Sequence, residues 1–246
     1  MTDTPADDLK PSFRSDVTVE LVKHSATDSD VLWAARVSTA GEQSLDELKK
    51  DPERSKGLIN YLMRDRHGSP FEHNSMTFFI SAPIFVFREF MRHRVGWSYN
   101  EESGRYRELQ PVFYVPGESR KLVQEGRPGK YVFVEGTQAQ QELVGNVMED
   151  SYRQAYEAYQ EMLAAGVARE VARAVLPVGL FSSMYATCNA RSLMHFLGLR
   201  TQHELAKVPS FPQREIEMVG EKMEAEWAKL MPLTHAAFNA NGRVAP

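Results

Sequence analysis

The segment Arg92–Tyr106, RHRVGWSYNEESGRY, concentrates side chains that can bind and orient an anionic ligand. It holds three arginines, one histidine, two adjacent glutamates, two serines and an asparagine within fifteen positions. Guanidinium groups form paired hydrogen bonds with phosphate, and a glycine such as Gly104 lets the backbone approach a ligand closely. Ser103 lacks the Gly-x-Ser-x-Gly context of a hydrolase nucleophile. The segment therefore predicts a binding surface for a phosphorylated ligand.

A second group of cations interrupts apolar segments in the second half of the chain. Arg169 and Arg173 lie four residues apart in VAREVARAVLP, and Arg191 and His195 repeat that spacing in NARSLMHFLGLR, which ends at Arg200. Residues four apart share a helix face. An exposed face with weak ion pairs would explain any one of these arginines about as well as a ligand does. A guanidinium within an apolar helix, however, needs a partner or a ligand, so these positions also predict anion binding.

The histidines and the cysteine offer other chemistry. His67 and His73 flank Glu72 in HGSPFEH, but this spacing in a proline-containing turn lacks the i, i+4 helical geometry of two-histidine metal sites. We therefore favour a polar turn beside a ligand pocket and expect no metal. Cys188, the lone cysteine, is interpreted as a small buried thiol within a helix. The sequence contains no glycine-rich phosphate fingerprint, so neither a Rossmann nor a Walker-type site is expected.

Composition excludes several classes of protein. The formal net charge of −4 over 246 residues gives no electrostatic footprint for nucleic acid. No apolar run is long enough to span a membrane, and the amino-terminal residues are polar and acidic, unlike a signal peptide. A single cysteine fits a reducing compartment. We expect a cytoplasmic protein with no nucleic-acid or membrane partner.

The elements that must position these residues follow from periodicity and turn residues. Hydrophobic alternation predicts strands, and a 3.6-residue period predicts helices. The pattern indicates a mixed α+β fold, in which a small, mostly antiparallel sheet packs with several helices. A flexible arm is expected at 1–14 and a single domain at 15–246. Strands are expected at 17–23, 75–82, 112–115 and 130–136; helices over VLWAARV and at 53–65, 84–94, 141–165, 167–177, 182–200 and 213–230; and loops at 40–53 and through much of 97–140.

Six blocks of sequence together resemble the flavin-dependent thymidylate synthases, in order, from about residue 17 to about residue 230. These blocks are ARVS (35–38), HGSPFEH (67–73), API (82–84), RHR with SYNEESGRY (92–106), AREVARAVLP (168–177) and NARSLMHFLGLR (189–200). The resemblance implies methylation of dUMP at C5 to give dTMP, with 5,10-methylenetetrahydrofolate as carbon donor and tetrahydrofolate as product. It also implies FAD as cofactor, NADPH as reductant, and a homotetramer with shared active sites.

The resemblance also assigns residues. It implies that Arg105 and Arg173 bind the dUMP phosphate, that Arg200 polarises the pyrimidine, and that Ser103 orients substrate without acting as a nucleophile. His67 is also placed to meet the folate. The positions matched to FAD are Ser38, His67, Ser69, Glu72, Arg92, His93, Arg94, Asn100, Glu101, Asn189 and His195. The positions matched to dUMP are Glu89, Glu101, Glu102, Ser103, Gly104, Arg105, Arg173 and Arg200.

Some features depart from the family pattern, and two other functions are open. Eight residues separate Arg94 from Ser103 where seven are usual, so we expect a bulge at Val95–Trp97. His195 replaces a frequent asparagine, and the 201–212 segment is longer than usual. The alternatives are a nucleotide-binding module built on the RHR cluster and a metal-dependent nucleotide phosphohydrolase that uses the four residues His67, Glu72, His73 and His93. A flavin-free thymidylate synthase would need an activated cysteine in a pocket, which the setting of Cys188 does not offer.

Overall fold

A four-stranded sheet dominates the computed structural model, which describes residues 10–40, 52–127 and 130–246. Its strands, in spatial order, are β2 (Thr18–Ser25), β3 (Ser75–Pro83), β8 (Phe181–Cys188) and β4 (Trp97–Glu101). The β2–β3 and β4–β8 pairs are antiparallel. Alternate residues of β3 are buried, as expected of a strand with one face on the core. The predicted α+β class, with a small and mostly antiparallel sheet, is confirmed.

The chain divides into two units, which are described separately. Unit 1 draws on the ranges 1–16, 82–85 and 102–182, and unit 2 on the ranges 17–81, 86–101 and 183–246. The single domain expected at 15–246 stays a prediction. The flexible arm was expected to end at residue 14. That prediction is wrong for β1 (Ser12–Arg14), because these residues pair in parallel with β5 (Val112–Tyr114); residues 1–9 lie outside the described ranges.

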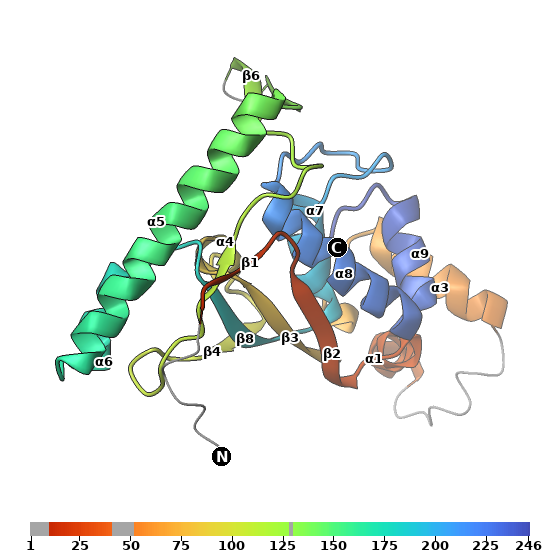
Figure 1. Cartoon of the computed structure of the whole chain (residues 1–246). Coiled ribbons are helices and arrows are strands. Elements are labelled where there is room, and N and C mark those ends of the chain that lie inside the picture. The colour runs from red at the N-terminus through yellow and green to blue at the C-terminus, as the bar shows by residue number, and fades with distance from the viewer. Residues whose placement is uncertain (1–9, 41–51, 128–129) are drawn as a thin grey trace. The chain divides into compact units, whose positions relative to one another are not determined.

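Unit 2 holds most of the sheet and the helices that pack on it. Trp227, Phe196 and Phe90 are fully buried in its core. The helix predicted after Thr27 begins there, where the Asp30 carboxylate accepts a hydrogen bond from the Thr27 main-chain N–H at 2.6 Å. The described helices of unit 2 are α1 (Asp28–Ala40), α3 (Pro52–Arg64), the 3-10 turn η2 (Ser69–Glu72), α7 (Ala190–Arg200), α8 (Arg214–Leu230) and α9 (Pro232–Ala240), and α4 (Ile84–Phe90) lies mostly within this unit. Helix α8 packs against β2 and against α7 (Figure 1).

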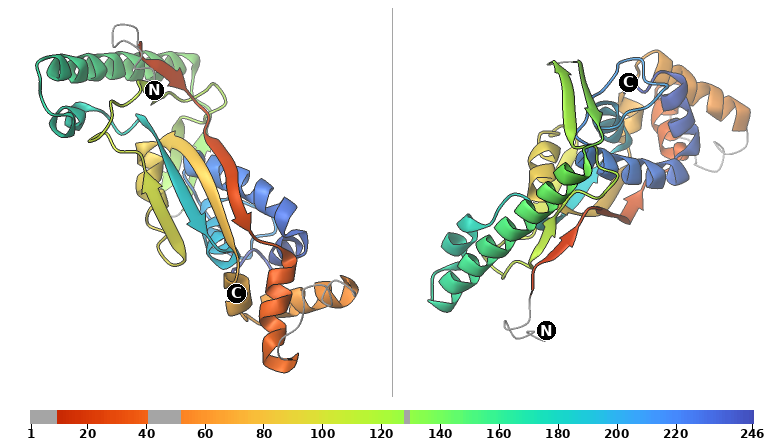
Figure 2. Two further views of the ribbon diagram at one scale, coloured as in Figure 1. Left: turned by 90° about the horizontal axis from the view of Figure 1, so that it is seen from below. Right: turned by 45° about the horizontal axis from the view of Figure 1, so that its top comes forward.

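Unit 1 is built around α5 (Gln138–Ala164), a long helix that both views of Figure 2 show clearly. Thr137 and Gln140 form a capping box at its start, with the Thr137 main-chain N–H donating to Gln140 Oε1 at 2.8 Å. Phe113 stacks on Tyr152 of α5 at a centroid distance of 4.9 Å and anchors a second hydrophobic core. The remaining elements are the hairpin β6 (Val123–Arg127) and β7 (Lys130–Val134), the short helix α6 (Arg169–Ala172) and the 3-10 turn η3 (Arg173–Val175).

The prediction of a single helix at 182–200 is wrong for the first part of this range. Its first part is β8, whose buried side chains Met184, Ala186 and Cys188 alternate along the strand, and only its second part is helical, as α7. The break falls at Asn189, whose side chain caps α7. Cys188 therefore ends a buried strand instead of lying within a helix, although its predicted burial is confirmed.

Other elements also differ from the prediction. The helix expected over 84–94 ends at Phe90, so RHR lies in a turn, and the loop expected after it is the strand β4. The helix expected over 167–177 is reduced to α6 and η3. Helix α9 was not predicted, because its sequence PLTHAAFNA follows α8 after a single residue. The remaining predicted helices and strands are present, and most of the loop expected at 40–53 lies outside the described residues. In the described part of the chain, no helix has the length and apolar character needed to cross a membrane.

Candidate active site

His93 lies in the turn between α4 and β4, with its ring edge-on to buried Phe196 at a centroid distance of 4.9 Å. Its Nε2 accepts a hydrogen bond from Arg200 Nε at 3.1 Å, and its main-chain carbonyl accepts one from the Tyr99 hydroxyl at 2.6 Å. Burial, followed by the charges of Arg200 and His195, lowers the pKa of His93 to about 4. At neutral pH the imidazole is therefore uncharged, and its Nε2 is an acceptor.

Arg200, the last residue of α7, is held by two partners. Its Nη1 pairs with Glu89 Oε2 at 2.8 Å, while its Nε donates to His93. The Arg200 and Glu89 side chains are 22% and 30% exposed, so the pair is partly withdrawn from water and less screened than a surface pair. Three predicted site residues thus lie together, and the Arg200 guanidinium has a defined orientation.

A pocket with a volume of about 460 Å³ adjoins His93 within unit 2. Five residues that the sequence predicted for flavin line it. The lining comprises Glu72, His93, Arg94, Val95, Gly96, Trp97, Asn189, Arg191, Ser192 and His195. The turn of RHR and the first turns of α7 therefore form its walls.

The amino-terminal end of α7 is fixed at this pocket. The Asn189 side chain accepts a hydrogen bond from the Ser192 main-chain N–H at 2.9 Å. Gly96 has a φ of 70°, and a Cβ added there would stand 2.1 Å from Ser192 Oγ, which donates to the Val95 carbonyl at 2.9 Å. A left-handed glycine packed on α7 thus closes the turn at Val95–Trp97, where the sequence predicts a bulge. The positive end of the helix dipole favours anions near this wall.

Arg191 was not among the predicted site residues, although its spacing with His195 was noted in the sequence. Its Nη1 pairs with Glu72, and its Nε donates to the Pro246 carbonyl at 2.7 Å. The i, i+4 relation to His195 on α7 was the signal that could have placed it in the site. The pocket wall therefore carries a guanidinium that is anchored on two sides.

The other residues predicted for flavin do not appear among the described residues lining this pocket. His67 stacks on Tyr61 at a centroid distance of 5.5 Å, and Ser38 Oγ donates to the Ala35 carbonyl. Ser69 lies in η2 and Arg92 in the turn after α4, while Asn100 and Glu101 lie on β4, opposite Tyr185 and Met184 of β8. These positions are exposed.

The residues at 102–105 and Arg173, which the sequence predicts for dUMP, lie together in unit 1. Gly104 is buried against the stem of Arg173, because an added Cβ would stand 3.2 Å from Arg173 Cδ and 2.8 Å from Leu109 Cδ1. Arg105 pairs with Glu170 of α6 at 3.0 Å. The 102–105 loop and the α6–η3 segment, which are distant in sequence, thus bring the predicted phosphate-binding arginines into one cluster.

Ser103 orients this loop. Its Oγ accepts a hydrogen bond from the Arg105 main-chain N–H at 3.3 Å, and its carbonyl accepts one from Tyr106. Unit 1 contains no histidine in its sequence, so it offers Ser103 no imidazole base. Glu102 lies 3.7 Å from Arg107 at the start of the same loop. These contacts suit a binding loop.

The side chains that the alternative functions would use as reactive groups are packed against other parts of the protein. Burial raises the pKa of the Cys188 thiol, which disfavours the nucleophilic thiolate. His67 stacks on Tyr61, and His73 lies edge-on to Trp33 at 6.2 Å. In ranges 10–40, 52–127 and 130–246, no three histidine, cysteine or acidic side chains gather as a metal site would require.

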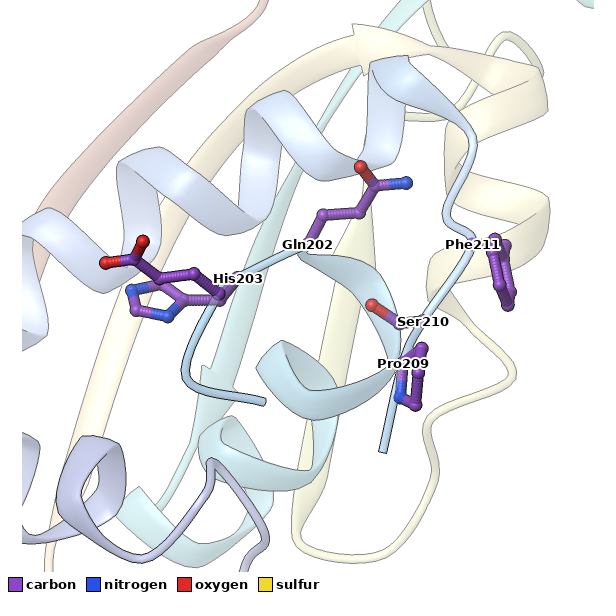
Figure 3. A pocket seen from close by; sticks show the side chains of 6 residues that line it. Gln202, His203, Pro209, Ser210 and Phe211 are labelled. Atoms are coloured by element: carbon purple, nitrogen blue, oxygen red, sulfur yellow. The ribbon is translucent and has the colours of Figure 1, made fainter. Parts of the chain in front are cut away.

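A second hollow, of about 440 Å³, lies in the 201–212 segment, and Figure 3 shows its side chains. Gln202, His203, Glu204, Pro209, Ser210 and Phe211 line it. His203 and Phe211 lie on opposite sides of the view, and His203 Nδ1 accepts a hydrogen bond from the Leu205 main-chain N–H at 3.1 Å. None of the predicted site residues lines this hollow, so we place the candidate site at the pocket beside His93.

Comparison with known proteins agrees with these motifs. The family described as thymidylate synthase complementing protein matches residues 20–233. The flavin-dependent thymidylate synthase of Streptomyces avermitilis is 98% identical over the whole length of both chains, and that of Tropheryma whipplei is 58% identical over 97% of this chain and 98% of its own.

A solved structure extends the match to three dimensions. The UMP/dUMP methylase PolB from Streptomyces cacaoi, bound with 5-Br dUMP, is 58% identical, with a TM-score of 0.89 over 95% of this chain and 99% of its own. The family match covers most of the chain and includes both residue clusters. This chain belongs to the flavin-dependent thymidylate synthase family.

Proposed function

We propose that this enzyme methylates dUMP at C5 to give dTMP, with 5,10-methylenetetrahydrofolate as carbon donor, FAD as cofactor and NADPH as reductant. Tetrahydrofolate is the folate product. The observation that carries the proposal is the convergence of five predicted flavin residues on the pocket that adjoins the Arg200–His93 pair. The similar PolB structure, which is that of a UMP/dUMP methylase, supports a uridine nucleotide as substrate.

The residues of the pocket fit a flavin dinucleotide. Arg94 and Arg191 give its wall positive charge, and the amino-terminal end of α7 adds the partial charge of its dipole. These features suit a pyrophosphate, while Asn189, His195 and Glu72 offer hydrogen-bonding groups. When bound, FAD would carry the hydride from NADPH that reduces the transferred carbon to a methyl group.

Arg200 would stabilise charge on the pyrimidine. Attack by C5 on the one-carbon unit requires an electron-rich, enolate-like uracil with negative charge on a carbonyl oxygen, and a preoriented guanidinium lowers the energy of that state. Glu89 and His93 set this orientation through contacts of 2.8 Å and 3.1 Å. The neutral imidazole of His93 accepts a hydrogen bond without repelling the arginine, which a charged imidazolium would do.

Arg105 and Arg173 would bind the nucleotide phosphate. Glu170 pairs with Arg105 through side chains that are both more than half exposed. Such an ion pair is weak, so a phosphate with greater negative charge can displace the carboxylate. Ser103 would hold the loop in shape through its bond to the Arg105 main chain, so we assign it a binding role and not that of a nucleophile.

A homotetramer with shared active sites is the assembly we propose. Apolar side chains remain exposed on the β6–β7 hairpin and on α5, including Val132 at 60%, Leu143 at 61% and Val147 at 54%. Exposed apolar surface of this kind favours association with another protein surface. Light scattering coupled to size exclusion would test the assembly. A cytoplasmic location stays a prediction from the lone cysteine.

The direct test is release of tritium from [5-³H]dUMP. Purified protein with FAD, NADPH and methylenetetrahydrofolate should release tritium and form dTMP, and leaving out any one of the three should stop dTMP formation. A folded protein that binds flavin but forms no dTMP under these conditions would contradict the proposal. Chelator-sensitive phosphate release without bound flavin would instead support a phosphohydrolase.

UMP is a second candidate substrate, favoured by the similarity to PolB, which is described as a methylase of both UMP and dUMP. The same assay with UMP in place of dUMP measures the preference directly. We expect dUMP to be preferred, and a larger kcat/KM with UMP would reassign the physiological substrate without changing the reaction.

A further inference from the structure

Residues 243–246, here called the strap, lie beside α7 within unit 2. At one end, the Arg243 guanidinium donates to Thr201 Oγ1 at 3.0 Å, just beyond the last turn of the helix. At the other end, the Pro246 carbonyl accepts from Arg191 Nε at 2.7 Å, in the first turn. The helix rises about 15 Å between these turns, and four extended residues span at most about 14 Å. The strap therefore runs along the helix from its last turn to its first.

The start of the strap is firmly anchored. Arg243 is 3% exposed, and its guanidinium meets the two carboxylate oxygens of Glu224 at 2.6 Å and 2.7 Å and Asn239 Oδ1 at 2.7 Å. Gly242 and Arg243 both have positive φ, which reverses the chain after α9. A buried guanidinium with four hydrogen bonds has few alternative conformations, so the strap leaves this point in one direction.

The end of the strap is held by two arginines. Arg66 Nη1 donates to the Ala245 carbonyl at 2.7 Å, and Arg191 holds Pro246. Ala245 is 7% exposed and Pro246 is buried, so their carbonyls need these donors. The contact in turn fixes the two guanidinium groups.

The Arg191 guanidinium is enclosed on further sides. It pairs with Glu72, and a Cβ added to buried Gly68 would stand 2.5 Å from Arg191 Cζ. It is thus seated on the backbone of the HGSPFEH turn and bonded to the strap, while it still lines the pocket. In Figure 2 (left) the end of the chain lies close to this turn.

We propose that the strap is a positioning element of the flavin pocket: the Pro246 carbonyl holds the Arg191 guanidinium in the orientation in which it lines the pocket. An arginine without this contact would sample many rotamers, and a ligand would have to order it. The inference rests on the proposed flavin function. It assigns a role in ligand affinity to main-chain atoms 55 residues from Arg191 in the sequence.

Deletion of Ala245 and Pro246 tests the strap, because it removes both carbonyl acceptors and leaves the Arg243 cluster intact. The matched control is Pro246→Ala, which keeps the carbonyl. Loss of one charge-assisted hydrogen bond predicts about ten-fold weaker FAD binding for the deletion, measured by fluorescence titration, and no change for the control. FAD binding by the deletion variant that equals that of the full chain would overturn the proposal.

A double-mutant cycle separates positioning from general loosening. If the strap acts through Arg191, Arg191→Ala should weaken FAD binding, and the deletion should weaken it no further in that background. Losses that add would show that the strap acts by another route.

Should the deletion fold poorly, Arg191→Lys replaces it, because a single ammonium cannot reproduce the two guanidinium contacts with Glu72 and Pro246. That variant should bind FAD about ten-fold more weakly with an unchanged thermal midpoint, and unchanged binding would count against the strap.

A further readout needs no flavin. Burial first, then the charges of Arg191 and Arg66, lower the pKa of His195. The deletion frees both arginines, so the His195 pKa measured by NMR should rise toward the ordinary histidine value, while Pro246→Ala leaves it in place. If the full chain binds no flavin, the proposed function fails, and this titration still decides whether the strap holds Arg191. An unchanged His195 pKa in the deletion variant would overturn the proposal that the strap holds Arg191.

Discussion

His93 is the residue at which the structure adds most to the sequence, because it is neutral in a cluster of arginines. Its folded pKa of about 4 lies below the ordinary value of 6.5. Between these two values the unfolded chain binds more protons, so stability falls as pH drops from about 6.5 toward 4. We expect an NMR titration midpoint near 4 and lower urea stability at pH 5 than at pH 7.5.

The control for this titration is His93→Gln, whose side-chain oxygen can still accept from Arg200 but cannot take a proton at these pH values. The variant should lose less stability between pH 7.5 and pH 5 than the wild type does. Equal losses would assign the pH dependence to other groups, His195 among them, since its pKa is also lowered.

Arg200 and Ser103 should differ sharply when each is replaced by alanine. Arg200→Ala removes the guanidinium that we propose polarises the pyrimidine, and it leaves Glu89 and His93 without this partner. We expect it to lose nearly all turnover, because removal of one such stabilising group costs about 10²–10³ in rate. Ser103→Ala should keep measurable turnover in the tritium-release assay.

The surface pair Arg64–Asp65 supplies a control for this comparison. Because Arg64 is 60% exposed, Arg64→Ala should leave turnover unchanged. Abolition of turnover by Ser103→Ala to the same extent as by Arg200→Ala would make Ser103 a catalytic residue after all. Activity retained in Cys188→Ala would agree with the burial of that thiol.

At the scale of elements, the sequence predicted most helices and strands but misplaced those around the site. Over 182–188 the alternation of Met184, Ala186 and Cys188 indicates a strand, yet the helical period of NARSLMHFLGLR obscured it, and Asn189 was not recognised as the cap. RHR reads as a helix end because Phe87, Phe90 and Met91 keep a helical period. What ends α4 early is the packing of the following turn on α7, a tertiary contact that no local pattern encodes.

Gly96 is the residue on which that turn depends. Its φ of 70° and the Ser192 Oγ position, 2.1 Å from an added Cβ, both oppose any side chain. Gly96→Ala should therefore destabilise the protein by about 2 kcal/mol or more, since the left-handed backbone alone costs about 1–2 kcal/mol for an L-residue. The measurement is urea unfolding with FAD absent.

Gly57 provides the matched control, because it lies exposed within α3 with nothing within 4 Å of an added Cβ. Gly57→Ala should stabilise by about 0.5–1 kcal/mol through helix propensity. If Gly96→Ala were also neutral or stabilising, the turn would not need the left-handed conformation. The turn that contains RHR would then not be fixed at the pocket by Gly96.

At the scale of the whole molecule, the sequence predicted the family and fold class but not how its site residues divide between the units. AREVAR and SYNEESGRY are 62 residues apart, counted from Tyr106 to Ala168, and only the folded chain brings Arg173 beside Gly104. Arg191 and the strap were missed for the same reason, since a main-chain carbonyl leaves no signature in the side chains. The proposed phosphate residues lie in unit 1, whereas Arg200 and the pocket that we propose for flavin lie in unit 2.

This division predicts that recognition of phosphate can be removed without loss of flavin binding. Arg173→Ala should lower the ratio of kcat/KM for dUMP over that for deoxyuridine by about 10–100-fold, since hydrogen bonds to charged groups are worth about 1.5–3 kcal/mol. Its FAD affinity should stay unchanged. Arg153→Ala, an exposed i, i+4 pair with Glu149 in the same unit, should change neither quantity. Arg200→Ala should lower turnover of both substrates and leave their ratio close to that of the wild type. A ratio that falls for Arg200→Ala and holds for Arg173→Ala would place the phosphate in unit 2 and reverse the two assignments.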